Sequence, residues 1–347
     1  MRDNILTVII MKKENSARLQ KWDILKFILI FLVVLGHIAD FSTRSNEYMR
    51  TLYLAIYTFH MPLFIFVSGL FAKKTVNEKR KDKIFGYLVL YFVLKFINFL
   101  YFWISAGKTS FSVFAETGLP WFMLALFAYS LITIAVKDFS PKHIMIFSVI
   151  IACLAGYDKN INSFLSLSRI IVFFPFYYAG YLFDAKKIEE HCKKRLPKMV
   201  SAIIISAFVL FAVFFGERFY WLRPLVTGAN PFATLNTCAD YGFLIRLGYY
   251  AVSAAICYAV IVLTPSKTPL GIAARIGKRT LPVYAFHYII LYILYYDIHI
   301  QPMLEAVSPI HWEWFSLPLA LAVTFVSANG LFNKIITAFS VLPIKRD

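Results

Sequence analysis

Three ionisable residues lie within an otherwise apolar segment, "WDILKFILIFLVVLGHIADF", residues 22–41. Asp23, Lys26 and His37 would each be costly in hydrocarbon, so each needs a partner, a cavity or a chemical task. In a helix, the eleven residues from Lys26 to His37 make three turns plus about 20°, so both share one face about 16 Å apart. Asp23 lies one turn before Lys26 on nearly the same side. The pattern predicts a cation near one end of a helix and a proton-transfer group deeper inside.

Each residue of this face also has a simpler interpretation. The long stem of Lys26 would let its ammonium group reach the membrane interface, and His37 would be a buried histidine that is hydrogen-bonded across helices. Neither interpretation explains why the two residues are aligned. Both remain open from the residues alone.

Two further histidines lie within apolar segments. His60 opens "FHMPLFIFVSGLF", residues 59–71, in which Ser68 is a further candidate site residue, and His287 lies in "RTLPVYAFHYIIL". Ser68 could equally serve helix packing, because small residues permit close contact between helices. Three of the seven histidines within predicted spans indicate a chemical centre.

Three other residues are weaker candidates. Glu116 stands just before "LPWFMLALF", which contains Trp121, and Arg275 opens "RIGKRTLPVYAFH". The simpler interpretation of Glu116 is a solvated loop charge. The simpler interpretation of Trp121 is an interface or packing residue. The cysteines Cys153, Cys192, Cys238 and Cys257 are scattered without a CxxC pair, so we expect no metal site.

The composition predicts an all-α, polytopic transmembrane helical bundle. Of 347 residues, 60% are hydrophobic and 16% charged, against about 45–50% and about 25% in soluble domains. About ten segments approach the length of a membrane span. They are residues 22–41, 52–71, 84–104, 119–136, 142–156, 169–184, 199–216, 246–264, 280–298 and 312–335.

The basic residues predict an orientation. If the N-terminus is cytoplasmic, 26 of the 36 Lys and Arg fall in cytoplasmic segments, 8 in outward segments and their edges, and 2 within spans. The positive-inside rule then places both termini in the cytoplasm. We expect a cytoplasmic tail over 1–21, a membrane domain over 22–335 and a cytoplasmic tail over 336–347, in a multi-pass protein of the plasma (inner) membrane. The net charge of +17 then reflects topology and contact with anionic membrane lipids and not a nucleic-acid partner.

Four segments, "DILKFILIFLVVLGH", "FHMPLFIFVSGLF", "LPWFMLALF" and "RIGKRTLPVYAFH", resemble the acyltransferase-3 family of multipass membrane O-acyltransferases, and its sugar O-acetylase members most of all. The resemblance covers roughly residues 18 to 335. Its most specific mark is a basic residue, ten intervening residues and a histidine on the first span, a spacing that Lys26 and His37 fit.

The resemblance implies transfer of an acyl group from cytosolic acyl-CoA, usually acetyl-CoA, and no permanently bound cofactor. The acceptor would be a hydroxyl of a cell-surface or exported glycan or of its lipid-linked precursor. In this scheme Lys26 binds the donor, His37 is the general base, and Asp23 keeps Lys26 charged and oriented. The alternative is a transporter or flippase with a buried polar pathway. Neither the acceptor, the acyl group, an acyl-enzyme intermediate nor the oligomeric state follows from the residues.

Overall fold

A computed structural model describes residues 2–107, 118–161, 164–268 and 271–340. Over these ranges the chain is helical and contains no β-strand, so the predicted all-α class is confirmed. The α-helices are α1 (Arg2–Ser42), α2 (Glu47–Leu70), α3 (Lys73–Asn77), α4 (Lys81–Ala106), α5 (Trp121–Val136), α6 (Pro141–Leu154), α7 (Leu167–Leu182), α8 (Ala185–Lys193), α9 (Arg195–Phe215), α10 (Arg223–Val226), α11 (Gly242–Leu263), α12 (Ile272–Gly277), α13 (Thr280–Tyr292), α14 (Ile300–Val307), α15 (Ser316–Ser327) and α16 (Gly330–Thr337). Short 3₁₀ segments are η1 (Ala155–Tyr157), η2 (Glu217–Leu222), η3 (Phe232–Tyr241) and η5 (Trp312–Phe315), and η4 (Ile293–Asp297) is a π-helical turn.

Among the described residues, five helices are long and apolar enough to cross a membrane, or up to seven if each of two bent pairs is one span. The pair Thr280–Asp297 and Ile300–Val307 bends by 68°, and the pair Trp312–Ser327 and Gly330–Thr337 bends by 57°. Helices α5, α6 and α7 are apolar but shorter. Each of the ten predicted segments coincides with a helix or a bent pair, while ten complete spans remain a prediction.

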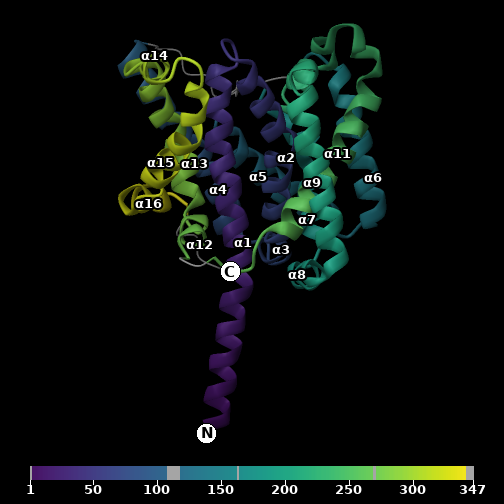
Figure 1. The fold of residues 1–347 in the computed structure, drawn as a ribbon. Coiled ribbons are helices and arrows are strands. Elements are labelled where there is room, and N and C mark those ends of the chain that lie inside the picture. Colours follow the sequence, from purple (N-terminus) through teal and green to yellow (C-terminus); the bar gives the residue numbers. More distant parts are fainter. Residues whose placement is uncertain (1, 108–117, 162–163, 269–270, 341–347) are drawn as a thin grey trace.

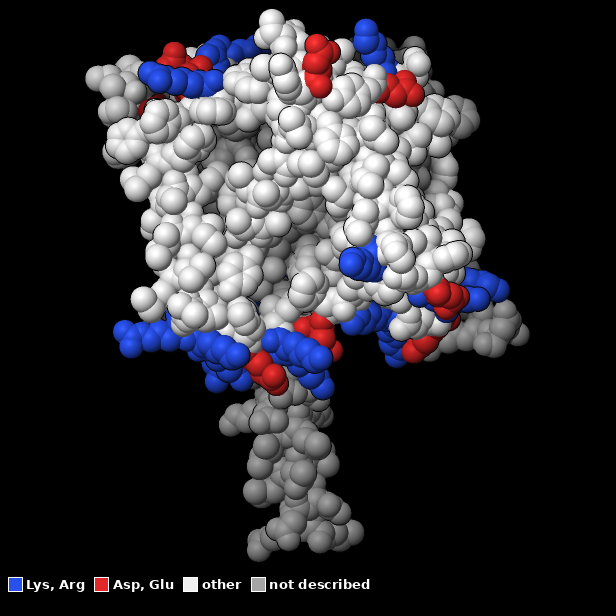
Figure 2. Space-filling view, turned by 90° about the vertical axis from the view of Figure 1, so that its right-hand side faces the viewer, with Lys and Arg blue, Asp and Glu red and all other residues white. Residues whose placement is uncertain are grey.

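The helices pack side by side, with α1 against α2, α12, α13 and α15 (Figure 1). The N-terminal part of α1 projects beyond the bundle at the end where α3, α8 and α12 lie, and α14 lies at the opposite end. The predicted tail boundary at residue 21 therefore falls inside one continuous helix. Figure 2 shows Lys and Arg gathered in a band at the end from which α1 projects, smaller groups of both charges at the other end, and a mostly uncharged flank between them.

Two glycines allow α2 and α7 to touch backbone to backbone. A Cβ on Gly69 would overlap the carbonyl oxygen of Tyr177, and a Cβ on Gly180 would overlap that of Phe66. Small residues permit this close approach in membrane bundles. The contact fixes the position of α2, which carries His60 and Ser68.

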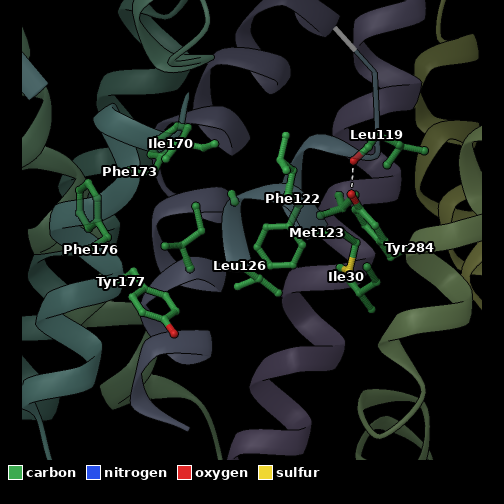
Figure 3. Close-up of a cluster of buried hydrophobic side chains, with 14 of the residues drawn as sticks. Ile30, Leu119, Phe122, Met123, Leu126, Ile170, Phe173, Phe176, Tyr177 and Tyr284 are labelled. Atoms are coloured by element: carbon green, nitrogen blue, oxygen red, sulfur yellow. Dashed lines mark hydrogen bonds between the residues drawn. The ribbon is translucent and has the colours of Figure 1, made fainter. Parts of the chain in front are cut away.

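The apolar core surrounds this pair and reaches α1, α5 and α13. Figure 3 shows Ile30, Phe122, Met123 and Leu126 facing one another between these helices. The Tyr284 hydroxyl donates a hydrogen bond to the Leu119 carbonyl, which ties α13 to the start of α5. The same side chains form the wall of an internal cavity.

The α2–α7 contact gives a direct test of the packing. Gly180→Ala should destabilise the protein by about 1–3 kcal/mol because the methyl group has no space, seen as a lower unfolding temperature of the purified protein in detergent. The matched control is Gly248→Ala in α11, where a Cβ would meet no described atom within 4 Å and alanine favours the helix. Equal unfolding temperatures in the two variants would contradict the close contact.

Candidate active site

A cavity of about 540 Å³ lies between α1, α2, α5, α7 and α13. Its wall is partly aromatic and apolar, and five charged side chains line it: Lys26, Asp40, Lys83, Arg169 and Arg223. Four of the five are cations, so the cavity favours an anionic guest. The charges divide into a group near the end from which α1 projects and a group near the opposite end.

Lys26 marks the first end. Its Nζ atom lies 2.7 Å from Oδ1 of Asp23, one turn earlier in α1, as the spacing predicts. The Lys26 side chain is 28% exposed and Asp23 is buried, so the ammonium group remains accessible from the cavity. Thr75, Lys83 and Thr280 line this end as well.

Helix α12 supports Asp23 from behind. A Cβ on Gly277 would overlap the Asp23 carbonyl oxygen, so only glycine allows this contact between α12 and α1. Arg275 lies on the same short helix but is exposed and is not among the residues that line the cavity. The structure thus places Arg275 outside the group formed by Lys26 and His37.

His37 lies three turns along α1 and faces the cavity. Its ring centroid is 4.9 Å from that of Tyr288, 5.4 Å from that of His287 and 6.4 Å from that of Tyr57. Nδ1 of His37 and Nε2 of His287 are buried without a hydrogen-bond partner among the described residues. The two rings therefore lie side by side, and each has one buried nitrogen that makes no hydrogen bond with the described part of the chain.

The second and third histidines are fixed by their own helices. Nδ1 of His287 lies 2.7 Å from the Val283 carbonyl, and Nδ1 of His60 lies 2.8 Å from the Ile56 carbonyl. A carbonyl oxygen can only accept, so each Nδ1 carries the proton and each neutral ring leaves Nε2 as an acceptor. His60 lines the cavity, whereas His287 is fully buried behind His37.

An ion pair stands at the far end of the cavity. Nη2 of Arg223 lies 2.6 Å from Oδ1 of Asp40, and the guanidinium carbon lies 5.2 Å from the centre of the Tyr53 ring. Burial alone would lower the pKa of Arg223, but the neighbouring Tyr53 and Asp40 hold that pKa above its ordinary value, so the guanidinium stays charged. This end thus offers a carboxylate and a cation beside His37.

The remaining candidates lie in different places. Ser68 and Trp121 line the cavity; the Ser68 hydroxyl donates to the Phe64 carbonyl at 2.9 Å, and the guanidinium carbon of Arg169 lies 5.1 Å from the centre of the Trp121 ring. Glu116 lies outside the described residues. The spacing of charges did not single out Asp40 and Arg223, although Asp40 lies three residues after His37 and so on the same face.

Residues 19–329 match the profile of the acyltransferase domain of the acyltransferase-3 family, a range that includes Asp23, Lys26, His37 and His287. The chain belongs to the acyltransferase-3 family. The expected membership is therefore confirmed over most of the chain.

This acyltransferase is also similar to two curated proteins called nodulation protein NolL. It is 27% identical over 286 residues to the one from Sinorhizobium fredii (strain NBRC 101917 / NGR234), an alignment of 76% of this chain and 75% of the relative. It is 23% identical over 288 residues to the one from Mesorhizobium japonicum (strain LMG 29417 / CECT 9101 / MAFF 303099), with 76% and 74% covered. No solved structure matches the acyltransferase.

Proposed function

We propose that this acyltransferase is a membrane O-acetyltransferase that moves an acetyl group from acetyl-CoA to a hydroxyl of a cell-surface or exported glycan or of its lipid-linked precursor. The observation that carries the proposal is the single cavity that holds Lys26 at one end and His37 with Asp40 at the other. The donor would enter at the Lys26 end and the acceptor at the opposite end. Family membership favours this function over the alternative of a transporter.

The donor occupies the Lys26 end. Coenzyme A carries several phosphate groups, and Lys26 and Lys83 both line this end of the cavity. Hydrogen bonds between charged nitrogen donors and phosphate oxygens are among the strong ones in proteins. Asp23 keeps the Lys26 ammonium oriented at 2.7 Å, and the flexible arm of the donor then extends about 16 Å along α1 toward His37.

The acid–base step takes place at the His37 end. A hydroxyl is a weak nucleophile until its proton is removed. His37 lines the same cavity as Lys26 and the Asp40–Arg223 pair. His37 accepts the hydroxyl proton while the oxygen attacks the thioester carbonyl. The carbon–sulfur bond breaks, coenzyme A leaves as a thiolate that takes up the proton, and the products are an acetyl ester and free coenzyme A.

His287 positions the base. Its Nδ1 is committed to the Val283 carbonyl, so its buried Nε2 is available to accept a hydrogen bond from Nδ1–H of His37, whose ring centroid lies 5.4 Å away. That bond would fix the tautomer of His37 with a bare Nε2 toward the cavity. The arrangement corresponds to nucleophilic sites in which a third group orients the base.

We further propose ten membrane segments, with both termini and the Lys26 end on the cytoplasmic side of the plasma membrane. The basic loops around α3, α8 and α12 lie at the end from which α1 projects. The positive-inside rule places that end in the cytosol, where acyl-CoA is made. The helices α5, α6 and α7 then cross as short segments beside longer neighbours.

Cysteine labelling tests this topology. In a variant without its four native cysteines, Ile310→Cys should react with a membrane-impermeant maleimide in intact cells, because Ile310 is 79% exposed beyond α14. Lys186→Cys, in the exposed part of α8, should react only after permeabilisation. The reverse order of labelling would refute the proposed orientation.

Steady-state kinetics test the two ends of the cavity separately. Lys26→Ala should raise the KM for acetyl-CoA by about 10- to 100-fold, because the substitution removes one hydrogen bond between charged groups. His37→Ala should lower kcat by about 10²- to 10⁴-fold, because it removes the general base. Membranes that contain the protein are incubated with acetyl-labelled acetyl-CoA. The release of free coenzyme A and the formation of labelled ester are then measured.

Two matched variants control this experiment. Lys26→Arg retains a cation and should keep most of the donor affinity, and His143→Ala removes an exposed histidine at the start of α6 and should change neither constant. Full activity in well-expressed His37→Ala would eliminate the mechanism. Absence of acetyl-CoA consumption in the unmodified protein would favour a transporter instead.

A further inference from the structure

A second hollow, an apolar groove of about 570 Å³, lies between α2, α9 and α11. None of the described residues that line it is charged, and Thr51, Thr58 and Tyr249 carry its only hydroxyl groups. Phe211 and Val252 line the groove and are 44% and 49% exposed, so it is open toward the side of the bundle. An apolar cavity of about 150 Å³ holds benzene, so this groove has room for a longer hydrocarbon.

Small residues leave this space between the helices. Ala55 of α2, Ala207 of α9, and Gly248 and Ala255 of α11 all line the groove. Small residues in membrane bundles usually let helices touch, as they do between α2 and α7. Here a Cβ on Gly248 would meet no described atom within 4 Å. The groove is therefore a gap that the neighbouring side chains do not fill.

The groove follows the half of these helices that is nearer to α14. Helices α2 and α11 begin, and α9 ends, at the α14 end of the bundle (Figure 1). The lining residues of α11 run from Ile245 to Ile256, which is about 16 Å along the helix. The hydrocarbon core of a bilayer is about 30 Å thick, or about 15 Å in each leaflet. The groove thus matches the depth of one hydrocarbon chain in one leaflet.

The groove adjoins the polar cavity at α10. Leu222 lines the groove, the next residue, Arg223, lines the cavity, and Val226 lines both. The paired side chains of Arg223 and Asp40 are 44% and 34% exposed, so this end of the cavity is accessible from outside. An apolar space and a polar space therefore meet at the same short helix.

Helix α2 separates the two spaces over the rest of their length. Tyr57 lines the cavity, whereas the next residue, Thr58, lines the groove. The ring centroid of Tyr57 is 6.4 Å from that of His37, so the groove lies one helix away from the proposed base. A ligand with a polar head and one apolar chain could occupy both spaces if it bends over α10.

We propose that the groove binds the hydrocarbon chain of a lipid-linked sugar acceptor, whose sugar lies in the cavity beside His37 and Asp40. A free glycan would leave the groove without a ligand, and an ordinary membrane lipid would leave the cavity without one. The inference rests on the proposed function and selects the lipid-linked precursor among its acceptors. Because bilayer hydrocarbon is as apolar as the groove, the chain mainly raises the local concentration of the sugar at His37.

Photolabelling tests the groove without relying on catalysis. The full chain is placed in phosphatidylcholine nanodiscs with a hexadecyl chain that carries a diazirine and is joined to glucose, galactose, mannose, fucose or N-acetylglucosamine. A matched probe joins the same chain to phosphocholine. We expect at least one sugar-headed probe to label the lining residues of α2, α9 and α11 at least about tenfold more than the phosphocholine probe, because its head is held in the adjoining cavity.

Gly248→Leu fills the groove. Its side chain enters open space and leucine favours a helix over glycine, so the variant should fold and should lower the labelling about 3- to 10-fold through lost van der Waals contacts. Ala254→Leu is the matched control, because Ala254 is exposed on the same helix and is not among the residues that line the groove. This variant should retain full labelling.

Equal labelling by the sugar-headed and phosphocholine probes would assign the groove to ordinary bilayer lipid and overturn the proposal. Absence of labelling in the groove, or equal labelling in Gly248→Leu and Ala254→Leu, would overturn it as well. Acetyl transfer to the sugar-headed probes is measured separately. Transfer without labelling of the groove would reject the chain site alone, whereas labelling that depends on Gly248 without transfer would reject the proposed function alone.

Discussion

Ionisable side chains are tolerated at membrane depth where they have a polar partner or face water, and the polar face of α1 meets this condition in two ways. Lys26 is paired with Asp23 at 2.7 Å, and His37 faces the cavity. Closing the neighbouring helices over this face would bury the Lys26–Asp23 ion pair and seal off His37. The cavity between α1, α2, α5, α7 and α13 follows from that constraint, and both ends of the proposed reaction depend on it.

Close backbone contacts position the helices beside this cavity. Gly69 and Gly180 bring α2 and α7 together, and Gly277 brings α12 against the Asp23 carbonyl. These contacts set α2 against α7 and α12 against α1, and α1, α2 and α7 all border the cavity. Lys26 and His37 lie on the single helix α1, so their separation is set by their spacing in that helix.

Local spacing made much of this face predictable. The Lys26–Asp23 pair and the alignment of His37 follow from helical periodicity, and the structure shows both on α1. The approach of His287 to His37 was not predictable, because it depends on how α13 packs against α1. Arg223 and Asp40 are 183 residues apart in the sequence, and only the folded chain brings them together.

The number of membrane spans was less predictable from the sequence, because it too depends on how the helices pack. Hydropathy locates apolar segments, and it already makes the predicted segment 169–184 as short as the 16-residue helix α7. It does not reveal the 57° bend within residues 312–335 or the 68° bend at the end of residues 280–298. Bends and short helices depend on neighbours that satisfy the freed backbone groups. A bent helix that borders a polar cavity can have its freed backbone groups satisfied there.

The central claim is that one cavity receives the donor at the Lys26 end and the acceptor at the opposite end. Its most direct test uses sealed membrane vesicles of known orientation, with acetyl-labelled acetyl-CoA supplied on one side only and incorporation into vesicle glycans measured. The account predicts labelling when acetyl-CoA reaches the face of α3, α8 and α12, and none when it reaches only the face of α14. Equal labelling from both sides, or labelling only from the α14 face, would contradict it.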